Sequence, residues 1–350
     1  MTLPLLLLAC NPDAGPILPA SAPTAPDTPP SAAPKAAART LELLDGSDAV
    51  AAADLDGDGF DELILIDDGE FLLDGVVLGT LRGSVQHVSR GDIDGDGDEE
   101  ALVATGAGRT DREAPAQLWA VHGDGAALLW EQAGERAQVA DLHVVDGRVF
   151  LAAFSDSRTV QGGWLDDGTL SVEGEASLGL AQLPMPDGSL LIGRIYGDEP
   201  RSDGDLKRHM GARISPLPTL RGVKALEVAD LDADGTVEVL VSDGWHYQYG
   251  HSATARVRLH TGDLLTARTI ASFDESYNVR HMEVFGDVGA QSILITASKA
   301  VHLLTRDNLG WRTMKLDTIS ETANAVVLKG ADGWWAAISG KATTKVPLEP

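Results

Sequence analysis

Short apolar runs separated by acidic or Gly-rich turns recur along the chain. Three segments align without gaps, and each has an apolar run, a loop of the form Asp-x-Asp-x-Asp-Gly-x-x-Glu and a second apolar run; they are residues 49–66, 87–104 and 225–242. Apolar runs of this length between turn residues are typical of buried strands. The pattern therefore predicts a repeated unit that begins with a β-hairpin.

The spacing of these segments predicts further copies. The loops begin at Asp54, Asp92 and Asp230, which are separated by 38 and 138 residues, and the second interval equals three steps of 46. Two copies that lack the acidic loop lie in the gap and two more follow it; they are residues 142–154, 180–195, 282–296 and 325–339. Three of these copies turn at an Asp-Gly pair, which favours a type I′ hairpin turn because both of its central residues need positive φ. These pairs are residues 146–147, 187–188 and 332–333.

The units therefore number seven. Residues 39–350 shared among seven units give about 45 residues each, the length of a four-stranded propeller blade. Each unit holds a second hairpin, except that the last unit has only one further strand's worth of chain, residues 342–348, while an apolar stretch at 40–44 precedes the first unit. We predict an all-β fold, a seven-bladed β-propeller of four-stranded antiparallel blades, closed by pairing of the N- and C-terminal strands. Gly at 38 of 350 residues and aromatic residues at 5% also fit a chain rich in turns.

The N-terminus has a different composition. An apolar run at residues 5–8 is followed by Ala9 and by Cys10, the one cysteine of the chain. This arrangement resembles the lipobox of bacterial lipoproteins, which implies a short signal peptide (residues 1–9) and a lipid on Cys10; an ordinary apolar N-terminus or a secretory signal is the alternative. After Cys10, eight prolines among Ala, Ser and Thr fill the stretch to residue 38, so we expect residues 10–38 to form a disordered tether.

The charge balance limits the partners. Lys and Arg number 27 and Asp and Glu 53, which gives a formal net charge of −26. This sign opposes binding to phosphate backbones and to anionic lipid surfaces, so we expect no nucleic-acid partner and membrane contact only through the N-terminal lipid. A single cysteine excludes an intramolecular disulfide and a Cys-rich zinc site.

The three acidic loops each place oxygen ligands at the same spacing. Four carboxylates around one point repel each other unless a cation lies between them, and Ca²⁺ fits best because it accepts six to eight hard oxygens in flexible geometry. We predict up to three structural Ca²⁺ ions, with acidic turns that bind nothing as the alternative. The ligands would be Asp54, Asp56, Asp58, the Phe60 carbonyl and Glu62; Asp92, Asp94, Asp96, the Asp98 carbonyl and Glu100; and Asp230, Asp232, Asp234, the Thr236 carbonyl and Glu238.

The loops also resemble the start of an EF-hand, which would need a Glu at the twelfth position and flanking helices. The twelfth positions are Leu65, Val103 and Val241, inside apolar runs, so an EF-hand is rejected. The segments instead resemble the FG-GAP/VCBS repeats of integrin α-subunit propellers and of many bacterial surface proteins, over roughly residues 40–348. The resemblance implies that the calcium loops join the first two strands of a blade on one face, and that the loops between the second and third strands lie on the other face.

Those opposite-face loops are long and gather basic and aromatic residues in an otherwise acidic chain. Long loops on a rigid scaffold are common binding sites, so we predict a ligand face that suits a glycan or a protein. The alternative is a set of variable surface loops whose Arg side chains pair with nearby carboxylates. The candidate residues are Arg208, His209, Trp245, His246, Tyr247, Tyr249 and His251.

The sequence favours binding over catalysis. It has no Gly-x-Ser-x-Gly elbow, no His-Glu-x-x-His motif and no Gly-rich phosphate loop. We expect a calcium-stabilised, lipid-anchored propeller that acts as a monomeric binding or adhesion module at the bacterial cell envelope, on the outer membrane. An envelope-linked carbohydrate-active enzyme (polysaccharide lyase or hydrolase) and a structural scaffold in an envelope complex are the alternatives.

Overall fold

The computed structural model describes residues 42–44, 46–108, 111–155, 158–196, 204–219, 222–245, 254–274, 276, 278–320 and 323–348. The chain divides into two units, Met1–Arg39 and Thr40–Pro350, and every described residue belongs to the second. The predicted signal peptide, Cys10 and the tether therefore lie outside the described residues. Across the described ranges all regular structure is β, and no helix is long and apolar enough to cross a membrane.

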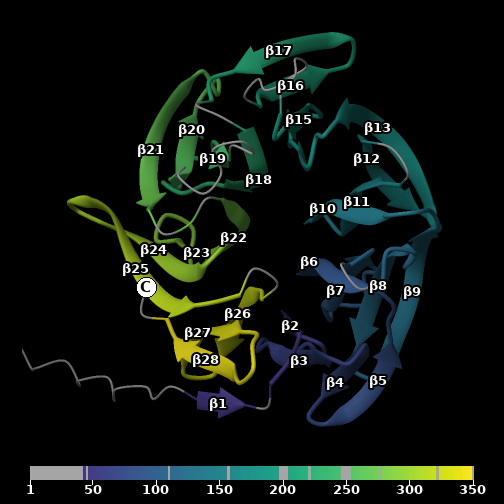
Figure 1. The fold of residues 1–350 in the computed structure, drawn as a ribbon. Coiled ribbons are helices and arrows are strands. Elements are labelled where there is room, and N and C mark those ends of the chain that lie inside the picture. The colour runs from purple at the N-terminus through teal and green to yellow at the C-terminus, as the bar shows by residue number, and fades with distance from the viewer. Residues whose placement is uncertain are drawn as a thin grey trace, which may run out of the picture. The chain divides into compact units, whose positions relative to one another are not determined.

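The strands of the second unit form seven four-stranded antiparallel sheets arranged as blades in a ring, which makes this unit a seven-bladed β-propeller (Figure 1). Blade 1 contains β2 (Ala49–Ala53), β3 (Glu62–Asp67), β4 (Glu70–Leu73) and β5 (Val76–Thr80). Blade 2 contains β6 (Ser84–Gly91), β7 (Glu100–Gly106), β8 (Ala116–His122) and β9 (Gly125–Gln132). Blade 3 contains β10 (Gln138–Val145), β11 (Arg148–Phe154), β12 (Thr159–Asp166) and β13 (Thr169–Ser177).

The remaining blades follow in chain order. Blade 4 contains β14 (Ala181–Pro184), β15 (Leu190–Gly193), β16 (Leu206–Met210) and β17 (Arg213–Leu217). Blade 5 contains β18 (Gly222–Ala229), β19 (Glu238–Trp245), β20 (Ala255–Thr261) and β21 (Thr266–Phe273), and blade 6 contains β22 (Val279–Phe285), β23 (Ser292–Ala297), β24 (Ala300–Asp307) and β25 (Gly310–Thr318). Blade 7 contains β26 (Ala325–Gly330), β27 (Gly333–Ile338), β28 (Thr343–Pro347) and β1 (Glu42–Leu44). Each of the seven predicted repeats coincides with the first hairpin of one blade.

The ring closes as predicted, through the two ends of the unit. β1 pairs antiparallel with β28, and Leu44 lies opposite Thr343. An isolated bridge between Ser47 and Gly340 extends this pairing, and the hydroxyls of Ser47 and Thr343 lie 2.7 Å apart in the buried interior. The last blade is therefore completed by a strand from the start of the unit.

Burial explains why the strand sequences differ within a blade. The innermost strand β2 is buried at every position, and its Ala-rich sequence fits the crowding near the ring centre. The second strands β7, β15 and β23 are buried at every position as well, because neighbouring blades cover both of their faces. The outer strand β13 is mostly exposed and polar.

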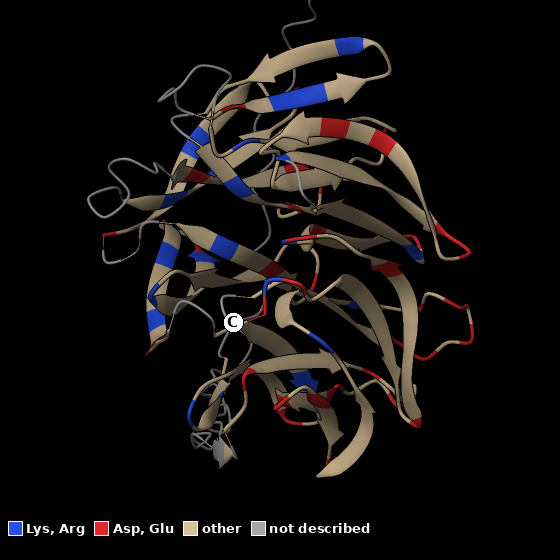
Figure 2. Cartoon of the chain, turned by 45° about the vertical axis from the view of Figure 1, so that its right-hand side comes forward, with Lys and Arg blue, Asp and Glu red and all other residues tan. Residues whose placement is uncertain are grey.

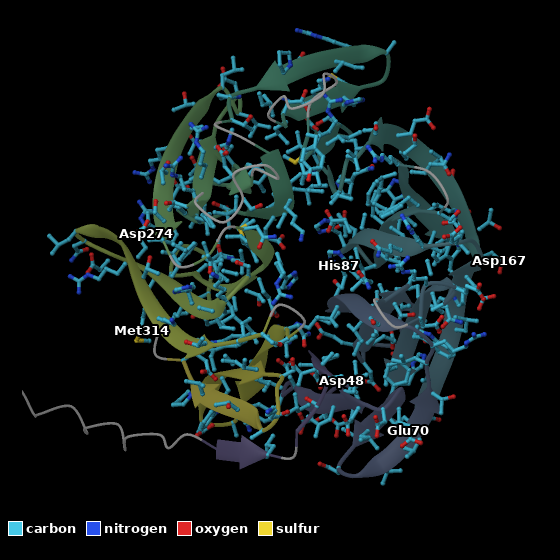
Figure 3. The ribbon with its side chains drawn as sticks, viewed as in Figure 1. Asp48, Glu70, His87, Asp167, Asp274 and Met314 are labelled. Atoms are coloured by element: carbon cyan, nitrogen blue, oxygen red, sulfur yellow. The ribbon has the colours of Figure 1, made fainter. Side chains whose placement is uncertain are left out.

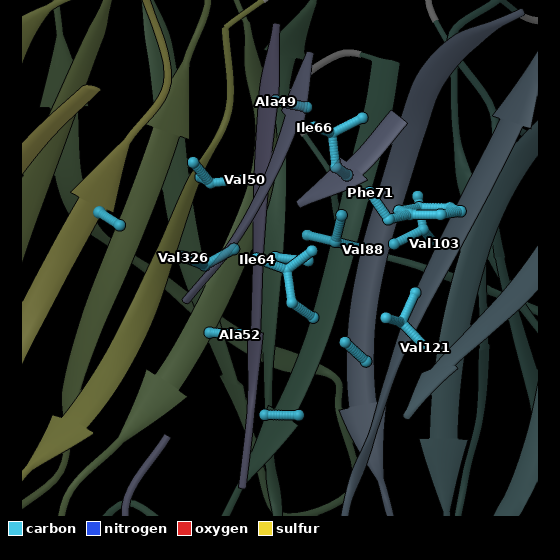
Figure 4. Packing of buried hydrophobic residues seen from close by; sticks show 14 of the residues in the cluster. Ala49, Val50, Ala52, Ile64, Ile66, Phe71, Val88, Val103, Val121 and Val326 are labelled. Carbon is cyan, nitrogen blue, oxygen red and sulfur yellow. The ribbon is translucent and has the colours of Figure 1, made fainter. Parts of the chain in front are cut away.

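Side chains from three blades form one continuous core around blade 1 (Figure 4). Val326 of blade 7 and Val103 of blade 2 both belong to the cluster that surrounds Ile64. Between blades 1 and 2, the rings of Phe71 and Trp119 meet edge to face with centroids 6.0 Å apart. Blade 1 is thus stabilised by apolar packing against both of its neighbours as well as by its own strand pairing.

The Asp-Gly turns match the prediction at one of three places. In blade 3, Asp146 and Gly147 both have positive φ (50° and 70°), as a type I′ turn requires. In blade 4 the turn begins earlier, because the Gly188 N–H donates to the Met185 carbonyl at 2.9 Å. In blade 7 Gly330 pairs with Gly333, which puts residues 331 and 332 at the centre of the turn. Residues 187, 188 and 332 therefore lie within the turns, but the predicted type I′ geometry centred on 187–188 and on 332–333 was wrong.

Removing β1 tests the closure. A variant that lacks residues 1–46 leaves β28 as an open edge and loses the ladder of three residue pairs. Each net hydrogen bond contributes about 0.5–1.5 kcal/mol, so the free energy of unfolding should fall by about 1–4 kcal/mol. Urea unfolding measures the change, with a variant that lacks residues 1–39 and keeps β1 as the control. Equal midpoints for the two variants would show that β1 does not close the ring.

Candidate functional site

The three acidic loops join the first and second strands of blades 1, 2 and 5 and therefore lie on one face of the ring. All three share one hydrogen-bond scaffold. In each loop the first Asp accepts a hydrogen bond from the backbone N–H of the Gly at the sixth position. The pairs are Asp54 with Gly59 (2.8 Å), Asp92 with Gly97 (3.2 Å) and Asp230 with Gly235 (3.0 Å).

The Glu that ends each loop fixes the loop's width. One of its carboxylate oxygens accepts a hydrogen bond from the backbone N–H of the second loop residue. The pairs are Glu62 with Leu55 (2.8 Å), Glu100 with Ile93 (2.9 Å) and Glu238 with Leu231 (2.9 Å). Burial, with a further contribution from the neighbouring Asp carboxylates, raises the pKa of all three Glu side chains. A cation shared by these carboxylates would relieve that repulsion.

The carboxylates of each loop converge on one point. In each loop the three Asp side chains offer one oxygen each, and these oxygens lie within 4.8 Å of one another. The Oδ1 atom of Asp54 is also buried without a hydrogen-bond partner. A buried anionic oxygen of this kind costs free energy unless an ion or donor reaches it. The donor set, all oxygen and mostly carboxylate, fits a hard divalent cation.

The loops are not equivalent. Loops 1 and 2 touch each other, because the Glu99 N–H donates to the Asp54 carbonyl at 2.8 Å. The third loop has Ala233 at the position of Gly57 and Gly95, with φ of 60°. This left-handed conformation costs an L-residue about 1–2 kcal/mol, so the third loop carries strain that the two Gly-containing loops avoid.

The second loop has a neighbour that sequence reasoning missed. His122, at the end of β8, places its Nδ1 atom 3.4 Å from the Glu100 carboxylate. Ligand atoms of His122, Glu100 and Asp94 lie within 4.8 Å of one another. His122 lies outside the loop sequence, so the spacing pattern carried no signal for it.

The predicted ligand face is placed differently for two of its residues. Arg208 and His209 lie in β16 and not in a loop. The Arg208 guanidinium forms an ion pair with Asp187, in the turn between β14 and β15. That turn joins the first two strands of blade 4, so Arg208 is directed toward the face of the acidic loops. The prediction that these two residues belong to an opposite-face loop was therefore wrong.

The other five predicted ligand-face residues begin at the end of β19. Trp245 is the last residue of β19, and its side chain is not described. His246, Tyr247, Tyr249 and His251 lie outside the described residues. Their ligand role stays a prediction.

The centre of the ring contains a channel. Two cavities, of about 870 Å³ and about 340 Å³, meet at His87, Arg280 and His281. Figure 3 shows His87 at the inner side of the ring, whereas Glu70 and Asp167 lie toward its outside. The larger cavity lies where the inner strands begin, and the smaller one extends toward the acidic loops.

Charged side chains of different blades form ion pairs at the smaller cavity. Arg90 of blade 2 contacts Asp61 at 2.5 Å and Glu283 of blade 6 at 3.5 Å. Both carboxylates also accept backbone hydrogen bonds from blade 7, Asp61 from Lys329 and Glu283 from Val327. Burial raises the pKa of Glu283 to about 7, against the opposing effect of Arg90.

Three histidines surround the middle of the channel. Burial lowers the pKa of His87, and it lowers that of His281 to about 4, so both are neutral at pH 7. Burial acts on His143 in the same direction, but the Asp141 carboxylate 3.2 Å from its Nε2 atom raises its pKa overall. Sequence reasoning missed His87 and His143, although both lie on predicted inner strands.

Comparisons with known proteins give one weak similarity. No family model matches the chain. The chain is similar to outer-membrane lipoprotein LolB of Pseudomonas paraeruginosa, with 27% identity over 185 residues that cover 47% of this chain and 86% of the relative. LolB of Pseudomonas aeruginosa matches with the same identity and coverage. At this identity, and with less than half of this chain covered, the similarity does not show a family.

Replacing Glu283 with Gln should change how stability depends on pH. Because the fold raises the pKa of Glu283 from 4.5 to about 7, the folded state retains a proton that the unfolded state releases, and stability is lost as the pH rises through this window. The amide cannot lose a proton. The free energy of unfolding of Glu283→Gln relative to wild type should therefore rise by on the order of 2–3 kcal/mol from about pH 4.5 to about pH 8.

Urea unfolding at both pH values measures this difference. Glu173→Gln is the control, because Glu173 is exposed on the outer strand β13. The control should show no such trend. A pH-independent difference for Glu283→Gln would contradict the buried, raised-pKa state of this carboxyl group.

Proposed function

We propose that this protein is a calcium-stabilised, lipid-anchored β-propeller of the FG-GAP/VCBS type that serves as a binding module on the outer membrane of a bacterium. The observation that carries the proposal is the shared scaffold of the three acidic loops, in which the same hydrogen bonds present converging carboxylates on one face. This scaffold lies on one face of the closed ring, and the opposite face would bind the partner.

The proposal that the loops bind calcium is supported by their oxygen ligands and by the repulsion among their carboxylates. The Asp carboxylates and the closing Glu of each loop would hold the ion, together with the carbonyls of Phe60, Asp98 and Thr236. Burial is the main cause of the raised pKa of the three Glu side chains, and a bound ion would cancel the further contribution from the neighbouring Asp carboxylates. It would therefore stabilise the turn between the inner strands rather than take part in a reaction.

The envelope location is supported by two independent observations. Cys10 follows an apolar run in the arrangement of a lipobox. The relatives that match part of the chain are outer-membrane lipoproteins. Together they support a lipid anchor on Cys10 and a propeller held at the outer membrane by the Pro-rich segment.

Calcium removal should lower the stability of the full chain. A site bound at a free calcium concentration about tenfold above its Kd adds about 1.4 kcal/mol to the free energy of unfolding. Thermal unfolding in calcium, in magnesium and in excess chelator measures the effect. The midpoint should be highest in calcium, and equal midpoints in calcium and chelator would refute the calcium sites.

Variants in one loop at a time show which loops produce the calcium-dependent shift of the unfolding midpoint. Asp54→Asn, Asp92→Asn and Asp230→Asn should each remove part of the calcium-dependent shift. Asp146→Asn is the matched control, because Asp146 is an exposed turn residue outside the three acidic loops and Asn tolerates its positive φ. A control that loses as much of the shift as the loop variants would show that the effect is not specific to the loops.

The anchor is tested by Cys10→Ser. This variant cannot be acylated at residue 10, so it should move from the membrane fraction to the soluble fraction of the expressing cell. Detection of the chain in both fractions, with Asp146→Asn as the control, measures the shift. Retention of Cys10→Ser in the membrane fraction would contradict the lipid anchor.

A further inference from the structure

The channel mouth combines space with convergent polar groups. Its cavity of about 870 Å³ lies within the range that holds small ligands. The innermost strands converge here, so blades far apart in the sequence contribute: Gln86 comes from blade 2, Lys224 from blade 5 and Arg280 from blade 6.

The charge of this cavity is opposite to that of the chain. Four cationic side chains line it, Arg112, Arg136, Lys224 and Arg280, whereas Asp48 is the single carboxylate among its described lining residues. Figure 2 shows Asp and Glu concentrated in the turns on its right-hand side, whereas Lys and Arg are more frequent on its left-hand side. In a chain with a net charge of −26, this cavity is a local site of attraction for anions.

The excess of positive charge is confined to the mouth. Deeper in the channel, beyond two neutral imidazoles, the carboxyl groups of Asp141, Glu227 and Glu283 line the smaller cavity together with Arg90. Arg90 lies 3.5 Å from Glu283 there, so the charges are partly balanced. An anion is therefore attracted more strongly at the mouth than deeper in the channel.

Two further observations point to a ligand at the mouth. Thr296 lines the cavity and is 2% exposed, and its buried Oγ1 atom has no hydrogen-bond partner. Arg136 has φ of 59°, a strained conformation for a non-Gly residue, and is held there by a hydrogen bond of 2.9 Å from its N–H to the Arg112 carbonyl. Strain of this kind is concentrated at binding sites.

We infer that the channel mouth binds a sugar that carries a carboxylate or phosphate group. The guanidinium groups of Arg112 and Arg136 bind the anionic group, since Arg matches both in planar, two-point geometry. The Thr296 hydroxyl and the amides of Gln86 and Gln138 supply partners for the sugar hydroxyls. The inference rests on the proposed binding function and names its ligand class.

The test uses sugars that differ only at C6, titrated into the full chain in calcium by calorimetry. Glucuronic acid and glucose 6-phosphate should bind, while glucose should bind at least about tenfold more weakly, as expected for loss of a charged hydrogen bond. Inorganic phosphate, without a sugar, should also bind more weakly than glucose 6-phosphate. Equal binding of glucose and the two acids, or of phosphate and glucose 6-phosphate, would overturn the inference, as would no binding of either acid.

Variants locate the site. Arg112→Gln with Arg136→Gln should weaken binding of both acids on the order of tenfold or more, because both charged donors are lost. Thr296→Val keeps the shape of the side chain and should weaken binding about two- to tenfold. The control is Arg213→Gln with Arg312→Gln, on the outer strands β17 and β25, which should bind as wild type does.

The outcomes separate this inference from the proposed function. Acid binding that persists in the Arg112/Arg136 variant, or falls equally in the control, would overturn the channel-mouth site. If the acids fail to bind while calcium still raises the unfolding midpoint and Cys10→Ser still leaves the membrane, the sugar site fails and the anchored propeller stands. Unfolding curves in calcium confirm that each variant is folded.

Discussion

Every blade of this propeller needs its neighbours on both sides. The second strands of blades 2, 4 and 6 are buried at every position, so either open side of such a blade would expose a full apolar face. Apolar surface costs roughly 25 cal/mol per Å² when exposed to water, which makes an open ring unfavourable at both of its ends. The constraint explains why the last blade takes β1 from the start of the unit.

The same constraint creates the channel. Inner strands that converge on an axis cannot all fill it with apolar side chains, because each presents one face to the shared centre. That face holds polar residues from several blades, among them His87, Asp141, Glu227 and Glu283. The ion pair of Arg90 with Glu283 then connects blade 2 with blade 6 across the centre. The channel is therefore polar because the inner strands converge on it, and its excess of positive charge lies at the mouth.

Local features of this fold could be predicted from the sequence, and features that depend on ring closure could not. The loop at Asp54–Glu62 has its ligands within nine residues, so spacing alone identified them. Arg208 and His209 were predicted to lie in a loop because β16 follows a stretch rich in turn residues. The sequence of β16 itself contains no apolar run that would mark it as a strand. His87 and His281 are almost two hundred residues apart in the sequence, and only the ring brings them together.

The pairing of β1 with β28 also determines how force enters the molecule. The chain that leads to the N-terminus meets the ring at β1, whose ladder to β28 has three residue pairs. Tension applied to the N-terminal segment therefore loads this short ladder before any other part of the ring. If the N-terminus is the anchor, the part of the propeller that yields first under pulling is the strand that completes its last blade.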